Sequence, residues 1–132
     1  MIGSKILLVD DAIIFTDNMS RLLKNRGYRV KAVNSGNAAI RALRKERFDV
    51  MVLDLRMSGM DGISTLKEIK KVGLHTKTLI LTGRGSMDKN LEVLKLGAYA
   101  YLTKPCEIVD LVTKIECAWE ENNDKVAFNK IE

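Results

Sequence analysis

Several features that define other classes of protein are missing from this chain of 132 residues. It has only two cysteines, Cys106 and Cys117, which are too few for a disulfide framework and favour a reduced, cytoplasmic compartment. No apolar run approaches the roughly 20 residues that a membrane span needs. The first residues lack the basic region and the long apolar region of a secretory signal, so we expect none. These absences predict a cytoplasmic domain without a membrane partner.

The chain also lacks internal repeats, low-complexity tracts and linkers rich in proline, glycine or serine. Its length suits one domain, and its 46% hydrophobic and 30% charged residues are typical of a globular protein. We expect one domain over residues 1–122 and a polar C-terminal tail over residues 123–132. Two interpretations of the tail stay open, namely a frayed end or the start of a truncated segment.

The charge is unbalanced, with 22 Lys and Arg against 17 Asp and Glu and a net charge of +5. Taken alone, this excess makes nucleic acid a candidate partner. The excess is local, however, because residues 12–47 hold nine Lys and Arg against two acids. We therefore interpret it as one basic flank of the domain, and we expect no direct nucleic-acid binding by this chain.

Short apolar runs alternate with longer amphipathic stretches along the chain. Residues 6–9, 50–53 and 78–81 are apolar without polar alternation, which indicates parallel strands covered on both faces. Weaker strand candidates are residues 28–33 and 99–102. Helical spacing of apolar residues marks the stretches 15–23, 38–45, 63–69, 91–96 and 108–119. Five strand–helix units predict an α/β fold, with a parallel sheet and helices on both of its faces.

Polar residues follow the predicted strands at the point where each strand ends. Because parallel strands end at one edge of their sheet, we expect these side chains to converge there. They are Asp10, Asp11, Asp54, Thr82 and Lys104. Each has an ordinary structural explanation by itself, such as an N-cap, a turn or a solvated lysine. The combination is what predicts a site.

Three carboxylates gathered at one edge repel one another unless a cation lies between them. All of these ligands are oxygen donors, and His75 is the single histidine, so the composition favours Mg²⁺ over zinc. A hydroxyl at Thr82 and a positive charge at Lys104 suit a phosphoryl group bound beside the metal.

The motifs around these residues resemble the receiver domain of bacterial two-component response regulators. ILLVDD resembles the acidic-pair motif of that family, and VLDLRMSGMDG resembles its phosphoacceptor motif. LTGRG resembles the motif that carries a threonine or serine, here Thr82. YLTKP resembles the motif that carries the lysine, here Lys104, and the switch aromatic, here Tyr101. The resemblance spans the chain from Lys5 to Asn122.

The resemblance implies a flavodoxin-like, doubly wound, five-stranded parallel sheet of order 2-1-3-4-5, with five helices on both faces. It implies that Mg²⁺ is bound by Asp10, Asp11, Asp54 and the backbone carbonyl of Arg56. It also implies a cis peptide bond before Pro105.

The resemblance further assigns roles in phosphoryl transfer. It makes Asp54 the phosphoacceptor, with Lys104 and Thr82 contacting the phosphoryl oxygens. Thr82 and Tyr101 would form the conformational switch that reshapes the face of the fourth helix, the fifth strand and the fifth helix. Arg84 would modulate hydrolysis of the phosphoryl group.

The resemblance also implies the partners. The phosphodonor would be a phosphohistidine of a sensor histidine kinase or of a histidine phosphotransfer protein, and the output would act on a protein target that the sequence does not identify. The domain would be no enzyme beyond catalysing its own phosphorylation and dephosphorylation. Phosphorylation-dependent homodimerisation stays open.

Two departures and three alternatives accompany this interpretation. Ser58 stands where family members commonly have proline, and Cys106 stands where an apolar residue is usual, so we expect Cys106 to act as a small hydrophobe.

The stretch GAYAYLTKPCE resembles receivers of AAA+-type regulators, so the chain could be the N-terminal receiver of a longer DNA-binding transcriptional regulator. A haloacid-dehalogenase-like phosphatase would need a second aspartate where Arg56 stands. A flavin-binding module would need a phosphate loop rich in Ser, Thr or Gly after the first strand.

Overall fold

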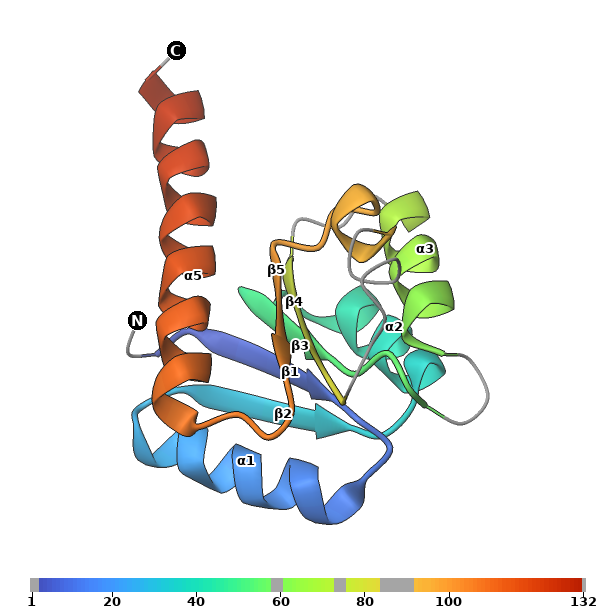
Figure 1. Cartoon of the computed structure of the whole chain (residues 1–132). Coiled ribbons are helices and arrows are strands. Elements are labelled where there is room, and N and C mark those ends of the chain that lie inside the picture. The colour runs from blue at the N-terminus through green and yellow to red at the C-terminus, as the bar shows by residue number, and fades with distance from the viewer. Residues whose placement is uncertain (1–2, 58–60, 73–75, 84–91, 132) are drawn as a thin grey trace.

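The predicted apolar runs form five parallel strands. The computed structural model describes residues 3–57, 61–72, 76–83 and 92–131. Its strands are β1 (Lys5–Val9), β2 (Arg29–Val33), β3 (Val50–Leu53), β4 (Lys77–Thr82) and β5 (Ala100–Thr103). They make one sheet in the order β2-β1-β3-β4-β5, which confirms the predicted order (Figure 1).

Helices cover both faces of this sheet. They are α1 (Ile13–Asn25), α2 (Gly36–Lys45), α3 (Gly62–Val72) and α5 (Ile108–Ile131), and residues 92–95 are also helical. Alternate residues of β1 point to opposite faces, so Ile6 packs in one core cluster with Met19 of α1 and Leu111 of α5. Leu7 packs in the other cluster with Leu43 of α2 and Leu66 of α3. β1 is therefore apolar on both faces because both faces of the sheet are covered.

The helix α1 ends where the sequence predicts. Gly27 has a φ of 98°, in the left-handed region that favours glycine, and its N–H donates to the carbonyl of Lys24 at 3.0 Å. The chain then enters β2 without a longer loop. The weaker candidate strand at residues 28–33 is thus a strand from Arg29, while Tyr28 is buried beside it.

The last helix is longer than the sequence analysis predicts. α5 has 24 residues and continues to Ile131, so the expected boundary at residue 122 falls inside a helix. Figure 1 shows the C-terminal part of α5 extending away from the sheet. Residues 123–131 continue α5. None of the helices that the structure describes has both the length and the apolar character of a membrane span.

The start of α3 lies unusually close to the loop after β3. The N–H of Gly62 donates to the carbonyl of Leu55 at 3.0 Å. A Cβ atom on Gly62 would lie 2.5 Å from the carbonyl oxygen of Asp54 and 2.5 Å from the Cα of Leu55. Backbone atoms cannot yield as a flexible side chain can. Glycine at this position therefore lets α3 hold the loop that carries Asp54.

We predict that Gly62→Ala lowers the free energy of unfolding by about 1–3 kcal/mol, because the added methyl group must push the Asp54 backbone away. Urea denaturation monitored by circular dichroism measures the change. Gly83→Ala is the matched control, since a Cβ there meets no atom within 4 Å. Equal stabilities of the two variants would contradict the steric explanation.

Candidate functional site

Three aspartates meet at the carboxyl edge of the sheet. Asp10 and Asp11 follow β1, and Asp54 follows β3. One carboxylate oxygen from each lies within 4.8 Å of the others. Asp10 and Asp54 are buried, at 2% and 6% exposure, whereas Asp11 is exposed. The predicted convergence of these carboxylates is therefore present.

The sheet register explains why the carboxylates meet. Val9 and Leu53 are partners in the parallel pairing of β1 with β3, so the next residue of each strand is an aspartate at the same level. The N–H of Asp54 donates to the carbonyl of Val9 at 3.0 Å and fixes this register at its end. A slip of one residue would turn one carboxylate to the opposite face.

Backbone N–H groups orient the two buried carboxylates. Oδ1 of Asp10 accepts from the N–H of Ala12 at 3.0 Å. In the same way, Oδ1 of Asp54 accepts from the N–H of Arg56 at 3.1 Å. Each turn holds one oxygen, which leaves the Oδ2 atoms for other partners.

Lys104 lies between these two Oδ2 atoms. Its Nζ is 2.5 Å from Asp10 and 3.6 Å from Asp54. The backbone N–H of Lys104 donates to the carbonyl of Thr82 at 2.7 Å, which ties the loop after β5 to the end of β4. The peptide bond between Lys104 and Pro105 is cis, the isomer that the resemblance implies.

Burial raises the pKa of Asp10 above its usual value. The hydrogen bond from Lys104 acts against this rise, as does the one from Ala12, while the charge of Asp54 adds to it. A carboxylate whose charged form is disfavoured gains from a nearby cation. The donor set, which consists of oxygens from three carboxylates, fits a hard divalent cation such as Mg²⁺.

The side chain of Thr82 is buried but has no hydrogen-bond partner. It is 3% exposed, and its Oγ1 is one of two such orphaned side-chain atoms in the described part of the chain, with Ser4 Oγ. An unsatisfied buried hydroxyl costs about 1–3 kcal/mol. Because Thr82 ends β4, beside β3 and its Asp54, an anionic oxygen bound at this edge could accept from it.

The structure places the remaining predicted residues in four different ways. Tyr101 lies on β5 and is 37% exposed, so its ring faces outward. Arg56 is exposed and contributes its backbone N–H to the site, while metal binding by its carbonyl stays a prediction. Arg84 and Ser58 lie outside the described residues. Cys106 is half-buried against the core, and burial raises the pKa of its thiol, which suits the expected role as a small hydrophobe.

Two residues near the site were missed in the sequence analysis. Asn34 follows β2 at the same edge, and its Nδ2 donates to the carbonyl of Asp10 at 2.7 Å and to Thr16 Oγ1 at 3.2 Å. Extending the strand-end rule to the weaker strand would have found it. Phe15 of α1 lies with its ring centroid 4.2 Å from Lys104 Nζ. The helical spacing of apolar residues identified Phe15 only as a core residue.

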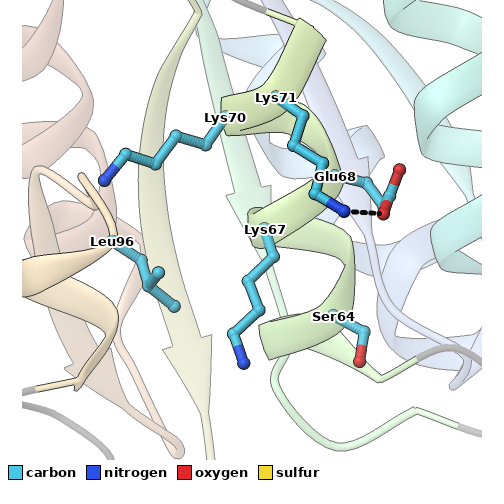
Figure 2. Close-up of a pocket in the computed structure, with 6 residues that line it drawn as sticks. All are labelled: Ser64, Lys67, Glu68, Lys70, Lys71 and Leu96. Carbon is cyan, nitrogen blue, oxygen red and sulfur yellow. Dashed lines mark hydrogen bonds and ion pairs between the residues drawn. The ribbon is translucent and has the colours of Figure 1, made fainter.

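A cavity of about 590 Å³ lies elsewhere, on α3. Figure 2 shows its lining residues, with the ion pair of Lys71 and Glu68 at 3.2 Å. They are Ser64, Lys67, Glu68, Lys70, Lys71 and Leu96. Its lining contains one carboxylate, so it does not offer the metal ligands found at the strand ends. The aspartate cluster is therefore the candidate functional site.

Comparison with known proteins gives a consistent result. Residues 6–116 match the response regulator receiver domain family. The transcriptional regulatory protein ZraR of Escherichia coli (strain K12) is 42% identical over 113 residues, which cover 86% of this chain and 26% of ZraR. The sporulation initiation phosphotransferase F of Bacillus subtilis is 32% identical over 111 residues, which cover 84% of this chain and 90% of that protein.

Solved structures have the same fold. A CheY-like response regulator receiver domain protein from Methanospirillum hungatei superposes with a TM-score of 0.89 and 27% identity, covering 93% of this chain and 98% of that one. A receiver domain protein from Clostridium thermocellum has a TM-score of 0.85 and 33% identity, covering 91% and 97%. This chain spans about a quarter of the length of the ZraR proteins that it matches.

We predict that Asp10→Asn raises the free energy of unfolding of the metal-free protein near neutral pH. The pKa of Asp10 is higher in the folded than in the unfolded chain, so its charged form opposes folding. As the pH falls through that raised pKa, the parent binds a proton and the advantage of the variant disappears.

Urea denaturation in EDTA, at neutral and at mildly acidic pH, measures this difference. Asp17→Asn, which changes an exposed aspartate of α1, is the control for a general charge effect. A variant that is less stable than the parent at neutral pH would show that Asp10 stabilises the fold through Lys104.

Proposed function

Because this chain belongs to the response regulator receiver domain family, we propose that it accepts a phosphoryl group on Asp54 and signals by a conformational change. Receiver domains are phosphoacceptor signalling domains that bind Mg²⁺ at a cluster of aspartates. The observation that carries the proposal is the position of Asp54, whose Oδ2 lies 3.6 Å from Lys104 Nζ inside the three-aspartate cluster.

The sheet order favours Asp54 over the other aspartates as the acceptor. Asp54 follows β3, which lies between β1 and β4. A phosphoryl group on its oxygen would therefore have the acidic pair on one side and Thr82 on the other. Asp10 Oδ2 is already bound closely to Lys104 at 2.5 Å. Asp54 Oδ2 is held less closely and is the better nucleophile.

The proposed reaction is a transfer between a phosphohistidine and a carboxylate. A carboxylate oxygen of Asp54 attacks the phosphorus, and the bond from phosphorus to the donor imidazole nitrogen breaks with its electron pair leaving on that nitrogen. Lys104 pairs with one phosphoryl oxygen, and Thr82 donates to another. Water later attacks the phosphorus of the acyl phosphate and releases inorganic phosphate. Catalysis is thus limited to the domain's own phosphorylation and dephosphorylation.

The residues present fit a bound Mg²⁺. Asp10, Asp11, Asp54 and the carbonyl of Arg56 would hold it, and the raised pKa of Asp10 supports a site for an added positive charge at this edge. Mg²⁺ would offset the repulsion between the acceptor carboxylate and the transferring phosphoryl group. In the structure, the Lys104 ammonium offsets part of the repulsion between the carboxylates of Asp10 and Asp54.

The proposed partners follow from the chemistry. The donor is a sensor histidine kinase or a histidine phosphotransfer protein, and the target is a downstream protein. Both cysteines are free thiols, which supports a cytoplasmic location. The names of several relatives are those of transcriptional regulators, which supports the alternative that this chain is the receiver of a longer DNA-binding protein. The reaction at Asp54 is the same in both cases.

The proposed switch uses the orphaned hydroxyl of Thr82. A phosphoryl oxygen on Asp54 would give Thr82 Oγ1 the acceptor that it lacks and would draw its side chain toward the site. The space left behind would admit Tyr101, which now faces outward from β5. The surface formed by residues 92–95, β5 and α5 would change shape as a result.

We predict that Asp54→Asn abolishes labelling by a radiolabelled small phosphodonor such as acetyl phosphate in the presence of Mg²⁺. The amide is no nucleophile toward phosphorus at neutral pH. Asp17→Asn is the control and should label like the parent. Undiminished labelling of Asp54→Asn would refute the assignment.

We predict that beryllofluoride with Mg²⁺ reduces the solvent exposure of Tyr101, because it mimics the phosphoryl group to which Thr82 moves. Fluorotyrosine NMR can measure this, with Tyr28, which is 6% exposed, as an internal reference. Thr82→Val keeps the shape but removes the hydroxyl, and it should block the change. An identical Tyr101 response in both proteins would exclude Thr82 as the trigger.

A further inference from the structure

Lys104 has an aromatic neighbour in addition to its two carboxylates. Its Nζ lies 4.2 Å from the ring centroid of Phe15, close enough for a cation–π interaction. The same Nζ is 2.5 Å from Asp10 Oδ2 and 3.6 Å from Asp54 Oδ2. The ammonium group is therefore held by two oxygens and one ring face.

The position of Phe15 in α1 brings its ring to the site. Phe15 lies in the first turn of α1, next to the strand ends, and it packs against the core cluster that contains Met19 and Leu23. Its neighbours Ile13 and Ile14 are 60% and 78% exposed. Phe15 is thus the apolar residue of this turn that faces inward, and core packing limits the movement of its ring.

We propose that Phe15 is a positioning residue that keeps the Lys104 ammonium beside Asp54 when a metal ion takes the carboxylate of Asp10. This inference rests on the proposed function of Asp54 as phosphoacceptor.

Competition between the metal and the lysine is the reason. Asp10 Oδ2 is bound to Lys104 in the structure, and the same carboxylate is a ligand in the proposed Mg²⁺ site. Mg²⁺ is coordinated by oxygen ligands and does not bind a hydrocarbon ring. When the lysine loses Asp10, its remaining partners are Asp54 Oδ2, which is itself a ligand in the proposed metal site, and the ring of Phe15. Without the ring, a flexible four-carbon side chain that is already 24% exposed would turn to solvent.

The effect should appear in the transfer step and not in metal binding. A lysine that is already beside Asp54 stabilises the transferring phosphoryl group without first being ordered. Because a partly desolvated cation–π pair has a modest energy, we expect its loss to slow phosphorylation by about three- to tenfold. The affinity for Mg²⁺ should stay within about twofold, since the ring touches no metal ligand in this scheme.

Substitutions of Phe15 by natural residues separate the contribution of its aromatic face from that of its packing in the core. Phe15→Leu keeps an apolar side chain in the core but removes the ring, and it should slow phosphorylation of Asp54 by acetyl phosphate at saturating Mg²⁺. Phe15→Trp restores an aromatic face and should recover most of the rate. Calorimetric titration gives the Mg²⁺ affinity of each variant, and thermal unfolding shows that each is folded.

Site-specific fluorination provides a test that leaves the packing almost unchanged. Fluorine atoms withdraw charge from the ring face, so mono-, di- and trifluorophenylalanine at position 15 should slow phosphorylation stepwise. Phe48 is the matched control, because Lys5 lies over its ring at 5.3 Å, far from the aspartates along the opposite end of β1. The same series at position 48 should leave the rate unchanged.

The outcomes distinguish the two proposals. A stepwise fall at position 15, with unchanged Mg²⁺ affinity and no fall at position 48, supports the positioning role. If the parent is labelled on Asp54 but fluorination at position 15 does not change the phosphorylation rate, the proposed role of Phe15 is wrong and the acceptor assignment stands. If the parent shows no labelling that depends on Asp54, both proposals fail.

Discussion

The repulsion between two buried carboxylates is the interaction on which the site depends. Asp10 and Asp54 follow neighbouring strands at the same level, because β1 and β3 pair in register up to Val9 and Leu53. Their charges are brought together by the sheet itself and cannot move apart without breaking it. The close contact with Lys104 and the proposed binding of a divalent cation are both responses to this arrangement.

The site also contains groups that the fold leaves unsatisfied. The raised pKa of Asp10 and the orphaned hydroxyl of Thr82 each cost stability in the protein alone. In the proposed function, a cation would relieve the first and a phosphoryl oxygen the second. Ligands that relieve such costs bind to the folded state and shift its conformation, because they interact differently with the two arrangements of Thr82. The proposed signalling thus depends on two unfavourable features of the unbound protein, the buried charge of Asp10 and the unpaired hydroxyl of Thr82.

The extent to which sequence predicts this molecule follows from the physics of each element. β1, β3 and β4 are covered on both faces, so their uninterrupted apolar runs identify them, and the strand-end rule then brings Asp10, Asp54 and Thr82 together. β2 is mostly exposed at the sheet edge and gives a weaker pattern. The ring of Phe15 over Lys104 joins residues far apart in the chain, and no local pattern encodes such a contact. The full length of α5 was missed because its last residues are polar.

Lys104 acts as a tethered counterion. Since it is covalently attached, it is present at the aspartates at a high effective concentration, and in the proposed function a metal ion would have to displace it from Asp10. Without the lysine, three carboxylates would attract a divalent cation more strongly, because no fixed positive charge would compete for them. The lysine thus balances the buried carboxylates in the protein alone, and in the proposed function it would be released toward the phosphoryl group when the metal binds.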